Sequence, residues 1–404
     1  MPEKMIARRE YLDKLAALRN KKIIKVITGV RRCGKSTLME MFQDDLKRQG
    51  TASEQIIAVN FEDYDFYELR DPKKLYAYIK ERLAGEAVTY IFLDEVQQCR
   101  DFQRVVDSLY LRKNVDLYVT GSNAHMLSSE IATLLSGRYV EIKMLPLSFR
   151  EYVESTGSTD DLARKYRAYL ENSSFPYALE LYGQPREIRD YLDAVYNTIV
   201  VKDIAARHKI TDTLILESIS RFIFDNIGNS LSTKRIADTL TANGRKIDVK
   251  TVEKYIAALM ESYIIYRAKR YNVKGRQYLK TQDKYYVVDI GLRYMLLGSS
   301  STDVGHILEN VVYLELLRRG YEVYVGKIDD LEVDFVAMDG KRTIYYQVAA
   351  TVRDEKTLQR ELAPLRKIDD YYPRIILTLD EDPEADYKGI RRINVLDWLM
   401  GAAE

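Results

Sequence analysis

The stretch Gly29-Val30-Arg31-Arg32-Cys33-Gly34-Lys35-Ser36 fits the pattern G-x-x-x-x-G-K-[S/T] of phosphate-binding loops. An apolar run, 23–27, precedes it, and a helical pattern, 37–42, follows it. This is the strand, loop and helix order that the pattern requires. The glycines let the backbone curl so that N–H groups and the helix N-terminus face phosphate oxygens. The stretch therefore predicts an α/β fold that binds a nucleotide directly after its first strand.

Each position of this loop has an expected role in nucleotide binding. Lys35 reaches the β- and γ-phosphates, and the Ser36 hydroxyl ligates Mg²⁺. Cys33 lies beside Lys35 and a helix N-terminus, which predicts a lowered thiol pKa and a redox-sensitive site, although an unconstrained loop position is the favoured reading. The predicted nucleotide-binding residues are Gly29, Val30, Arg31, Arg32, Cys33, Gly34, Lys35, Ser36 and Thr37.

A second motif agrees with the loop. The apolar run 90–93 ends in Asp94 and Glu95. Asp94 is expected to hold Mg²⁺ through its water shell, and Glu95 to orient or activate the water that attacks the γ-phosphate. Taken alone, the pair suits two solvated acids that cap a strand. With the phosphate loop upstream, it favours an ATPase over a protein that only binds nucleotide.

Two further residues are expected near the γ-phosphate. The run 117–119 ends in 120–123, where we assign Asn123 first and Ser122 second to a position between the γ-phosphate and the attacking water. An ordinary polar turn is the alternative. Arg138 lies between the fourth predicted helix and the fifth predicted strand and suits an arginine finger that reaches a neighbouring subunit. A solvated arginine at a helix end fits it equally well.

Pattern changes divide the 404 residues into compact parts. Short apolar runs alternate with amphipathic helices up to residue 142, which predicts a parallel sheet covered on both faces. We expect an ATPase core at 1–150, a helical lid at 151–213, a winged helix-turn-helix at 214–300 and a further α/β domain at 301–404.

Together these segments resemble bacterial and archaeal AAA+-type P-loop ATPases that carry a winged helix and a C-terminal domain like restriction endonucleases. The resemblance spans nearly the whole chain. It implies ATP, dependence on Mg²⁺, and a core sheet of order 5-1-4-3-2 under a helical lid. The Gly-Gly-x-Pro turn of that lid appears here as Ser173-Ser174-Phe175-Pro176. Besides the first two motifs, the resemblance rests on 120–123, 137–139, 145–152, 308–310 and 332–335.

The last domain is predicted to be a degenerate PD-(D/E)xK nuclease fold. Glu309 and Asp334 fit the first two acidic positions of that motif. The third position reads Gln347-Val348-Ala349, so that an amide replaces one carboxylate and the lysine is missing. Glu309 and Asp334 can hold a weakly bound metal, but a structural or binding role is favoured over phosphodiester cleavage.

Charge patterning leaves the partner open. A net charge of +1 provides no global field that would attract a polyanion. The candidate recognition helix carries Lys250 and Lys254, and basic residues alternate with Tyr271 and Tyr278 along the ribbon that follows. This pattern suits DNA phosphates and suits a solvated or docked wing equally. The basic ribbon residues are Arg267, Lys269, Arg270, Lys274, Arg276 and Lys280.

The sequence thus predicts an ATPase that moves a winged helix and an inactive nuclease-like domain, with DNA as a candidate partner. One alternative is an ATP-gated nuclease that uses Glu309 and Asp334. The other is an ATP-responsive DNA-binding regulator without significant turnover. Arg138 acting on a neighbour requires a homo-oligomer. No run approaches the ~18 apolar residues of a membrane span, so we expect a cytoplasmic protein without a membrane partner.

Overall fold

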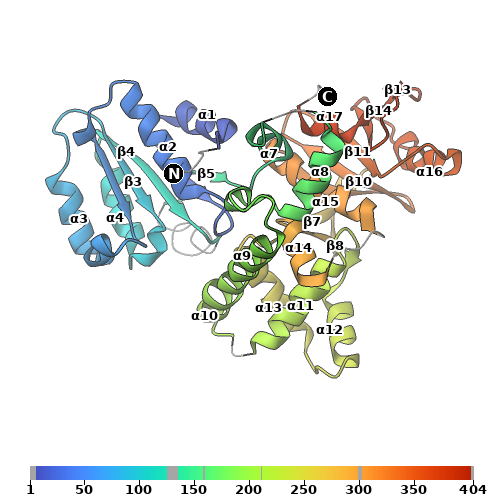
Figure 1. Ribbon diagram of the computed structural model, residues 1–404, viewed down its shortest axis with the longest axis horizontal. Helices are drawn as coiled ribbons and strands as arrows, with labels where there is room; N and C mark the ends of the chain where they lie inside the picture. The colour runs from blue at the N-terminus through green and yellow to red at the C-terminus, as the bar shows by residue number, and fades with distance from the viewer. Residues whose placement is uncertain (1–5, 125–134, 158–159, 211, 299–302, 402–404) are drawn as a thin grey trace. The chain divides into compact units, whose positions relative to one another are not determined.

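The computed structural model describes residues 6–124, 135–157, 160–210, 212–298 and 303–401 (Figure 1). The chain divides into two compact units, each described here by itself. The first unit comprises Met1–Pro146 and Glu261–Tyr263, and the second comprises Leu147–Met260 and Ile264–Glu404. Among the described residues, no helix combines the length and the apolar composition that crossing a membrane requires.

The first unit is built on a five-stranded parallel sheet of order β2-β3-β4-β1-β5. This confirms the predicted order and the five predicted strands. β1 pairs with both β4 and β5, and each of its five residues is buried. The strands are β1 (Ile24–Thr28), β2 (Ile56–Asn60), β3 (Thr89–Asp94), β4 (Val115–Gly121) and β5 (Tyr139–Lys143).

Alternate side chains of these strands face opposite helical layers. Phe92 and Tyr118 face α2, because the ring of Phe42 lies 6.4 Å from the first ring and 5.3 Å from the second. Leu93 and Val119 belong to the opposite core, which α3 and α4 cover. Both faces are therefore covered, as predicted. The helical segments are α1 (Arg9–Leu18), η1 (Ser53–Gln55), η2 (Tyr64–Arg70), η3 (Val96–Gln98), α2 (Lys35–Arg48), α3 (Pro72–Glu81) and α4 (Phe102–Tyr110).

A buried ion pair joins β1 to β4. The Lys25 ammonium, which is fully buried, contacts the Asp116 carboxylate and donates to the Lys21 carbonyl at 3.0 Å. Asp116 also accepts hydrogen bonds of 2.9 Å from the Tyr118 hydroxyl and the Asn20 N–H. Burial lowers the pKa of Lys25, and the charge of Asp116 opposes that shift. Each charge therefore depends on its partner.

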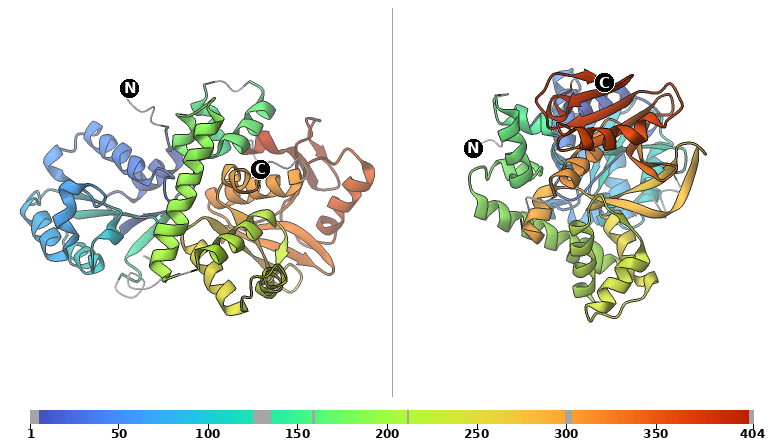
Figure 2. Two further views of the ribbon diagram at one scale, coloured as in Figure 1. Left: turned by 60° about the horizontal axis from the view of Figure 1, so that its bottom comes forward. Right: turned by 90° about the vertical axis from the view of Figure 1, so that its right-hand side faces the viewer.

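The second unit contains a nine-stranded mixed sheet of order β13-β14-β12-β11-β10-β9-β7-β8-β6 (Figure 2). Its long strands confirm most of the strands predicted after residue 260, whereas β14 was not predicted. The strands are β6 (Ser230–Leu231), β7 (Ile265–Asn272), β8 (Gln277–Val287), β9 (Glu322–Ile328), β10 (Leu331–Met338), β11 (Thr343–Ala349), β12 (Arg374–Thr378), β13 (Ala385–Asp386) and β14 (Ile390–Asn394).

Helices of the second unit confirm the predicted pattern of three helices before the ribbon, α11, α12 and α13. The helical segments that precede them are α7 (Phe149–Ser155), α8 (Leu162–Asn172), η4 (Pro176–Leu179), α9 (Pro185–Asn197), η5 (Thr198–Ala205) and α10 (Ala206–His208). Those that follow are α11 (Thr213–Asp225), α12 (Thr233–Ala242), α13 (Val249–Glu261), α14 (Ile290–Leu297), α15 (Val304–Arg318), α16 (Glu355–Arg366) and α17 (Val395–Leu399).

The ribbon of β7 and β8 continues into the C-terminal strands. β7 pairs in parallel with β9, from Lys269 opposite Tyr324 to Asn272 opposite Lys327. The boundary expected at residue 300 therefore lies between strands of one shared sheet. A pairing between segments more than 50 residues apart leaves no local pattern in the sequence, so the prediction did not include it.

The turn at 173–176 replaces glycine flexibility with hydrogen bonds. Ser173 adopts φ 74°, which lies in the left-handed region that favours glycine. The next residue, Ser174, donates to Asp289 Oδ2 from its N–H at 2.7 Å and from its hydroxyl at 2.6 Å. These bonds to a buried carboxylate hold the turn in place.

Asp116→Ala is expected to lower the free energy of unfolding by about 3–5 kcal/mol, because it leaves the Lys25 ammonium buried without a charged partner. Glu68→Ala is the matched control, since Glu68 pairs with Lys74 at the surface and such pairs contribute about 0–1 kcal/mol. Urea denaturation followed by circular dichroism measures both. Equal losses in the two variants would contradict this account.

Candidate functional site

The predicted phosphate loop connects β1 to α2 and has the curled backbone that the motif requires. Gly29, Arg32 and Gly34 have φ values of 153°, 67° and 100°. A Cβ atom at Gly29 would lie 2.2 Å from the Met144 carbonyl oxygen, so only glycine fits there. Because α2 begins at Lys35, the N–H groups of its first turn have no partner within the helix and face the loop.

Lys35 is buried inside this loop and is 4% exposed. Its ammonium donates to the carbonyls of Gly29 at 3.1 Å and Val30 at 3.2 Å. It also lies 3.7 Å from Glu95 Oε1. The loop's own oxygens and one carboxylate thus satisfy the ammonium, and oxygens of a ligand can replace them.

Asp94 and Ser36 lie together at the end of β3. The Ser36 hydroxyl forms a hydrogen bond with the Asp94 carboxylate, and the Thr120 hydroxyl donates to Asp94 Oδ1. Burial raises the pKa of Asp94, and these two hydrogen bonds oppose the shift. A hydroxyl beside a carboxylate is the oxygen donor set that Mg²⁺ prefers, so these residues fit the predicted metal.

Glu95 is held in one orientation directly after β3. Its Oε2 atom accepts hydrogen bonds from the Ser122 hydroxyl, at 2.9 Å, and from the Gln97 side-chain amide. Burial alone raises the pKa of Glu95, but the charge of Lys35 and these two hydrogen bonds lower it overall. The ionised carboxylate that results is the form that a general base requires.

Sequence reasoning placed two of these contacts incompletely. It ranked Asn123 above Ser122, yet the observed hydrogen bond to Glu95 comes from Ser122, while Asn123 is buried. It did not assign Gln97, although Gln97 follows the acidic pair by two residues. The signal for Gln97 was present in the motif 93–97, which was quoted only for the resemblance.

Arg138 contacts its own chain. Its guanidinium pairs with Asp107 of α4 and lies over the ring of Tyr110, 5.5 Å from the ring centre. The side chain is 40% exposed. Its action on a neighbouring subunit stays a prediction, and such action requires exchange of the contact with Asp107.

The expected low thiol pKa of Cys33 is wrong. Cys33 is fully buried, and its Sγ atom lies 3.6 Å from the Met144 carbonyl oxygen. Burial raises the pKa of the thiol and outweighs the opposing charges of Lys35 and Arg8. The thiol is protonated and shielded, so the expectation of a redox-sensitive loop is not supported.

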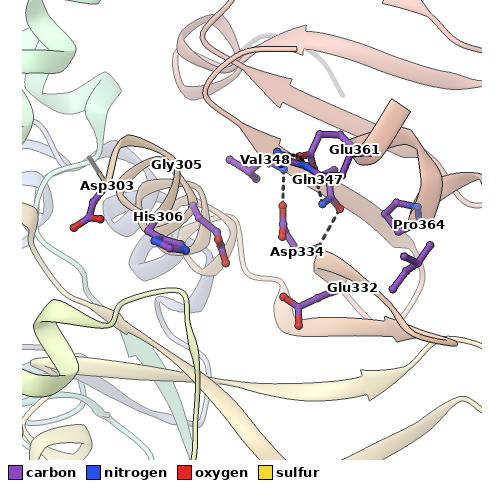
Figure 3. A pocket seen from close by; sticks show the side chains of 12 residues that line it. Asp303, Gly305, His306, Glu332, Asp334, Gln347, Val348, Glu361 and Pro364 are labelled. Carbon is purple, nitrogen blue, oxygen red and sulfur yellow. Dashed lines mark hydrogen bonds and ion pairs between the residues drawn. The ribbon is translucent and has the colours of Figure 1, made fainter. Parts of the chain in front are cut away.

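A second candidate site is a pocket of about 430 Å³ in the second unit (Figure 3). Three residues predicted from the nuclease motif line it: Glu309 of α15, Asp334 of β10 and Gln347 of β11. Asp334 Oδ2 accepts from the Val348 N–H at 2.8 Å, and Gln347 donates to Glu361 at 2.9 Å. The fold therefore brings the predicted residues together.

Lys284 of β8 supplies a cation that sequence reasoning missed. Its ammonium lies 2.9 Å from Glu309 Oε1 and 2.8 Å from Glu332 Oε1. Burial alone lowers the pKa of Lys284, but the charges of Glu309, Asp334 and Glu332 raise it overall. The ammonium stays protonated at neutral pH, which excludes Lys284 as a general base.

The same contacts argue against a metal in this pocket. Glu309 Oε1 accepts from the Tyr286 hydroxyl as well as from Lys284. Burial and the nearby charge of Glu309 raise the pKa of Asp334 well above its ordinary value. In the described parts of the chain, no three His, Cys, Asp or Glu side chains form a group that could hold a metal ion. Glu309 and Asp334 therefore do not fit the expected weak metal site.

Comparisons with known proteins agree with the first site. Residues 21–153 match the AAA domain, and residues 163–303 match a domain of unknown function, DUF8612. An uncharacterized protein of Haemophilus influenzae is 38% identical to this chain and covers 99% of it, over 100% of its own length. An uncharacterized protein of Methanocaldococcus jannaschii is 27% identical, with 89% of this chain and 82% of that protein covered.

Among solved structures, a Walker-type ATPase of Pyrococcus abyssi has a similar fold, with a TM-score of 0.51 and 15% identity. The likeness covers 73% of this chain and 97% of that chain. The sheet order, the phosphate loop after β1 and the acidic pair after β3 define a P-loop ATPase fold of the AAA class. The chain belongs to the family of AAA-domain proteins that includes the Haemophilus influenzae protein.

Lys284→Met is expected to lower the free energy of unfolding by about 3–5 kcal/mol, because it leaves Glu309 buried without a cation. Adding Glu309→Gln to this variant should restore part of the loss, because no charge then remains unpaired at that position. Trp398, the only tryptophan of the chain, is buried in the second unit and reports its unfolding in urea.

Lys274→Met is the control for this cycle, since Lys274 pairs with Asp329 at the surface. If Lys284→Met were no more destabilising than Lys274→Met, Lys284 would not be the cation that compensates the pocket.

Proposed function

We propose that this protein hydrolyses ATP in a Mg²⁺-dependent reaction at the phosphate loop. The observation that carries this proposal is the geometry of Glu95, a buried and ionised carboxylate that Ser122 and Gln97 hold in place. A glutamate that only capped a strand would be solvated and would not need two buried donors. The fold similarity to a Walker-type ATPase supports the proposal.

In the proposed reaction, the N–H groups of the loop and the Lys35 ammonium bind the β- and γ-phosphates. Ser36 and Asp94 are the residues that would hold Mg²⁺, which supplies charge neutralisation at the phosphates when bound. Glu95 accepts the proton of the attacking water, and Ser122 and Gln97 orient Glu95. Asn123 and Arg138 remain candidates for contact with the γ-phosphate.

We also propose that the second unit responds to the nucleotide. The order of α11, α12, α13, β7 and β8 supports a winged helix-turn-helix, as expected for 214–300. Much of the basic charge of the ribbon is compensated within the chain. Arg267 pairs with Asp283, Arg270 with Glu332, and Lys274 with Asp329. DNA binding would therefore depend chiefly on Lys250 and Lys254 of α13, which are exposed.

The ATP-gated nuclease finds little support. Cleavage of a phosphodiester bond requires an activated water, and this pocket offers a protonated Lys284 and a carboxyl group with a raised pKa, that of Asp334. A pocket with these properties supports a structural or binding role.

Lys35→Ala is expected to abolish binding of ATP, whereas Glu95→Gln should retain binding and lower turnover by about 10²–10⁴-fold, because it removes the proton acceptor. A fluorescent ATP analogue measures binding, and phosphate release with Mg²⁺ measures turnover. Glu68→Gln, at an exposed surface pair, is the control and should match the wild type. Wild-type turnover in Glu95→Gln would exclude Glu95 as the base.

Ser122→Ala is expected to shift the acid limb of the pH-rate profile to higher pH. The hydrogen bond from Ser122 lowers the pKa of Glu95, so its loss raises that pKa, and the ionised base then forms only at higher pH. Turnover measured from pH 5 to pH 9 on both proteins tests this. A limb that stays in place would show that Ser122 does not act through Glu95.

A further inference from the structure

Arg31 places a second cation of the phosphate loop inside the candidate site. Its guanidinium lies 3.0 Å from Glu62 Oε1. Glu62 follows β2, where its N–H donates to the Asn60 side-chain oxygen at 2.9 Å. Arg31 therefore links the loop after β1 to the segment after β2, at the edge of the sheet where the nucleotide is expected.

The burial of this pair is unequal. The Arg31 side chain is 10% exposed, whereas that of Glu62 is 42% exposed. A partner that is largely solvated returns little of the free energy lost when a guanidinium leaves water. A purely structural ion pair does not account for an arginine held in this buried position.

Charges alternate across the site in the order Glu62, Arg31, Glu95 and Lys35. Arg31 is close enough to Glu95 to lower its pKa, and Lys35 lies 3.7 Å from the same carboxylate. Two cations thus approach the proposed base from one loop. An ATP γ-phosphate next to Glu95 would lie within the field of both.

We propose that Arg31 contacts the γ-phosphate of ATP bound to the same chain and stabilises the charge that develops there during hydrolysis. This inference rests on the proposed ATPase function. Glu62 holds the guanidinium when the site is empty and releases it to phosphate oxygens when ATP binds. In P-loop ATPases and GTPases such a charge is supplied by an arginine from the same chain or from a partner.

The reaction itself balances without further components. Water forms the new bond to the γ-phosphorus, Glu95 accepts the water proton, and the bond from the γ-phosphorus to the bridging oxygen breaks to release ADP. Arg31 transfers no proton and only neutralises charge. Because all these groups belong to one chain, the rate per chain does not depend on assembly or on Arg138.

The test compares full-length wild type, Arg31→Ala, Arg31→Lys and Glu62→Gln, with Arg48→Ala as a control at an exposed surface pair. Single-turnover hydrolysis is measured from ~0.1 to ~10 μM protein, and fluorescent ATP and ADP analogues measure affinity. Arg31→Ala should slow hydrolysis on the order of 10³-fold and weaken ATP binding more than ADP binding. Arg31→Lys should be intermediate, and Glu62→Gln and Arg48→Ala should retain the wild-type rate.

Three results would overturn the inference: wild-type hydrolysis by Arg31→Ala, equal loss of ATP and ADP affinity in that variant, or a rate per chain that rises with protein concentration. A wild-type protein that binds ATP without turnover would contradict the proposed function alone. In that case the ratio of ATP to ADP affinity in Arg31→Ala still decides whether Arg31 contacts the γ-phosphate.

Discussion

A carboxylate that is removed from water needs a cation beside it, and both candidate sites are organised by that requirement. In the first unit, Lys35 lies 3.7 Å from Glu95, and in the second, Lys284 lies 2.9 Å from Glu309. The remaining partners of each lysine differ. Lys35 is otherwise held by neutral carbonyls of a loop, whereas Lys284 is shared between two carboxylates. An incoming polyanion can take Lys35 from neutral partners far more easily than it can separate Lys284 from two anions.

This difference explains why only one of the two sites suits a charged ligand. The phosphate loop presents two cations, Lys35 and Arg31, and helix N–H groups that are unsatisfied within α2. The pocket near Asp334 already contains its cation, and its carboxylates accept hydrogen bonds from the chain itself. The nuclease motif is thus retained as an internal charge network, with Lys284 and not a metal ion as the compensating charge.

Local motifs made the first site predictable. The loop, the acidic pair and the polar turn after β4 are short segments, and the parallel sheet brings the carboxyl ends of its strands to one edge, so spacing alone places these residues together. Burial and phase were not predictable in the same way. The pattern could not show that Ser122 rather than its neighbour Asn123 reaches Glu95, nor that burial would outweigh the charges around Cys33. Lys284 lies 25 residues before Glu309, and only the sheet and α15 bring them together.

The continuous sheet changes what the second unit can do. Lys284 belongs to the ribbon, and its ion pairs reach α15 through Glu309 and β10 through Glu332. The pairing of β7 with β9 adds backbone hydrogen bonds along the same seam. To move the ribbon as a separate wing would break this pairing and leave buried charges without partners. A response of the second unit to nucleotide would therefore move the ribbon and the C-terminal strands together, so the predicted winged helix and nuclease-like domain act as one body.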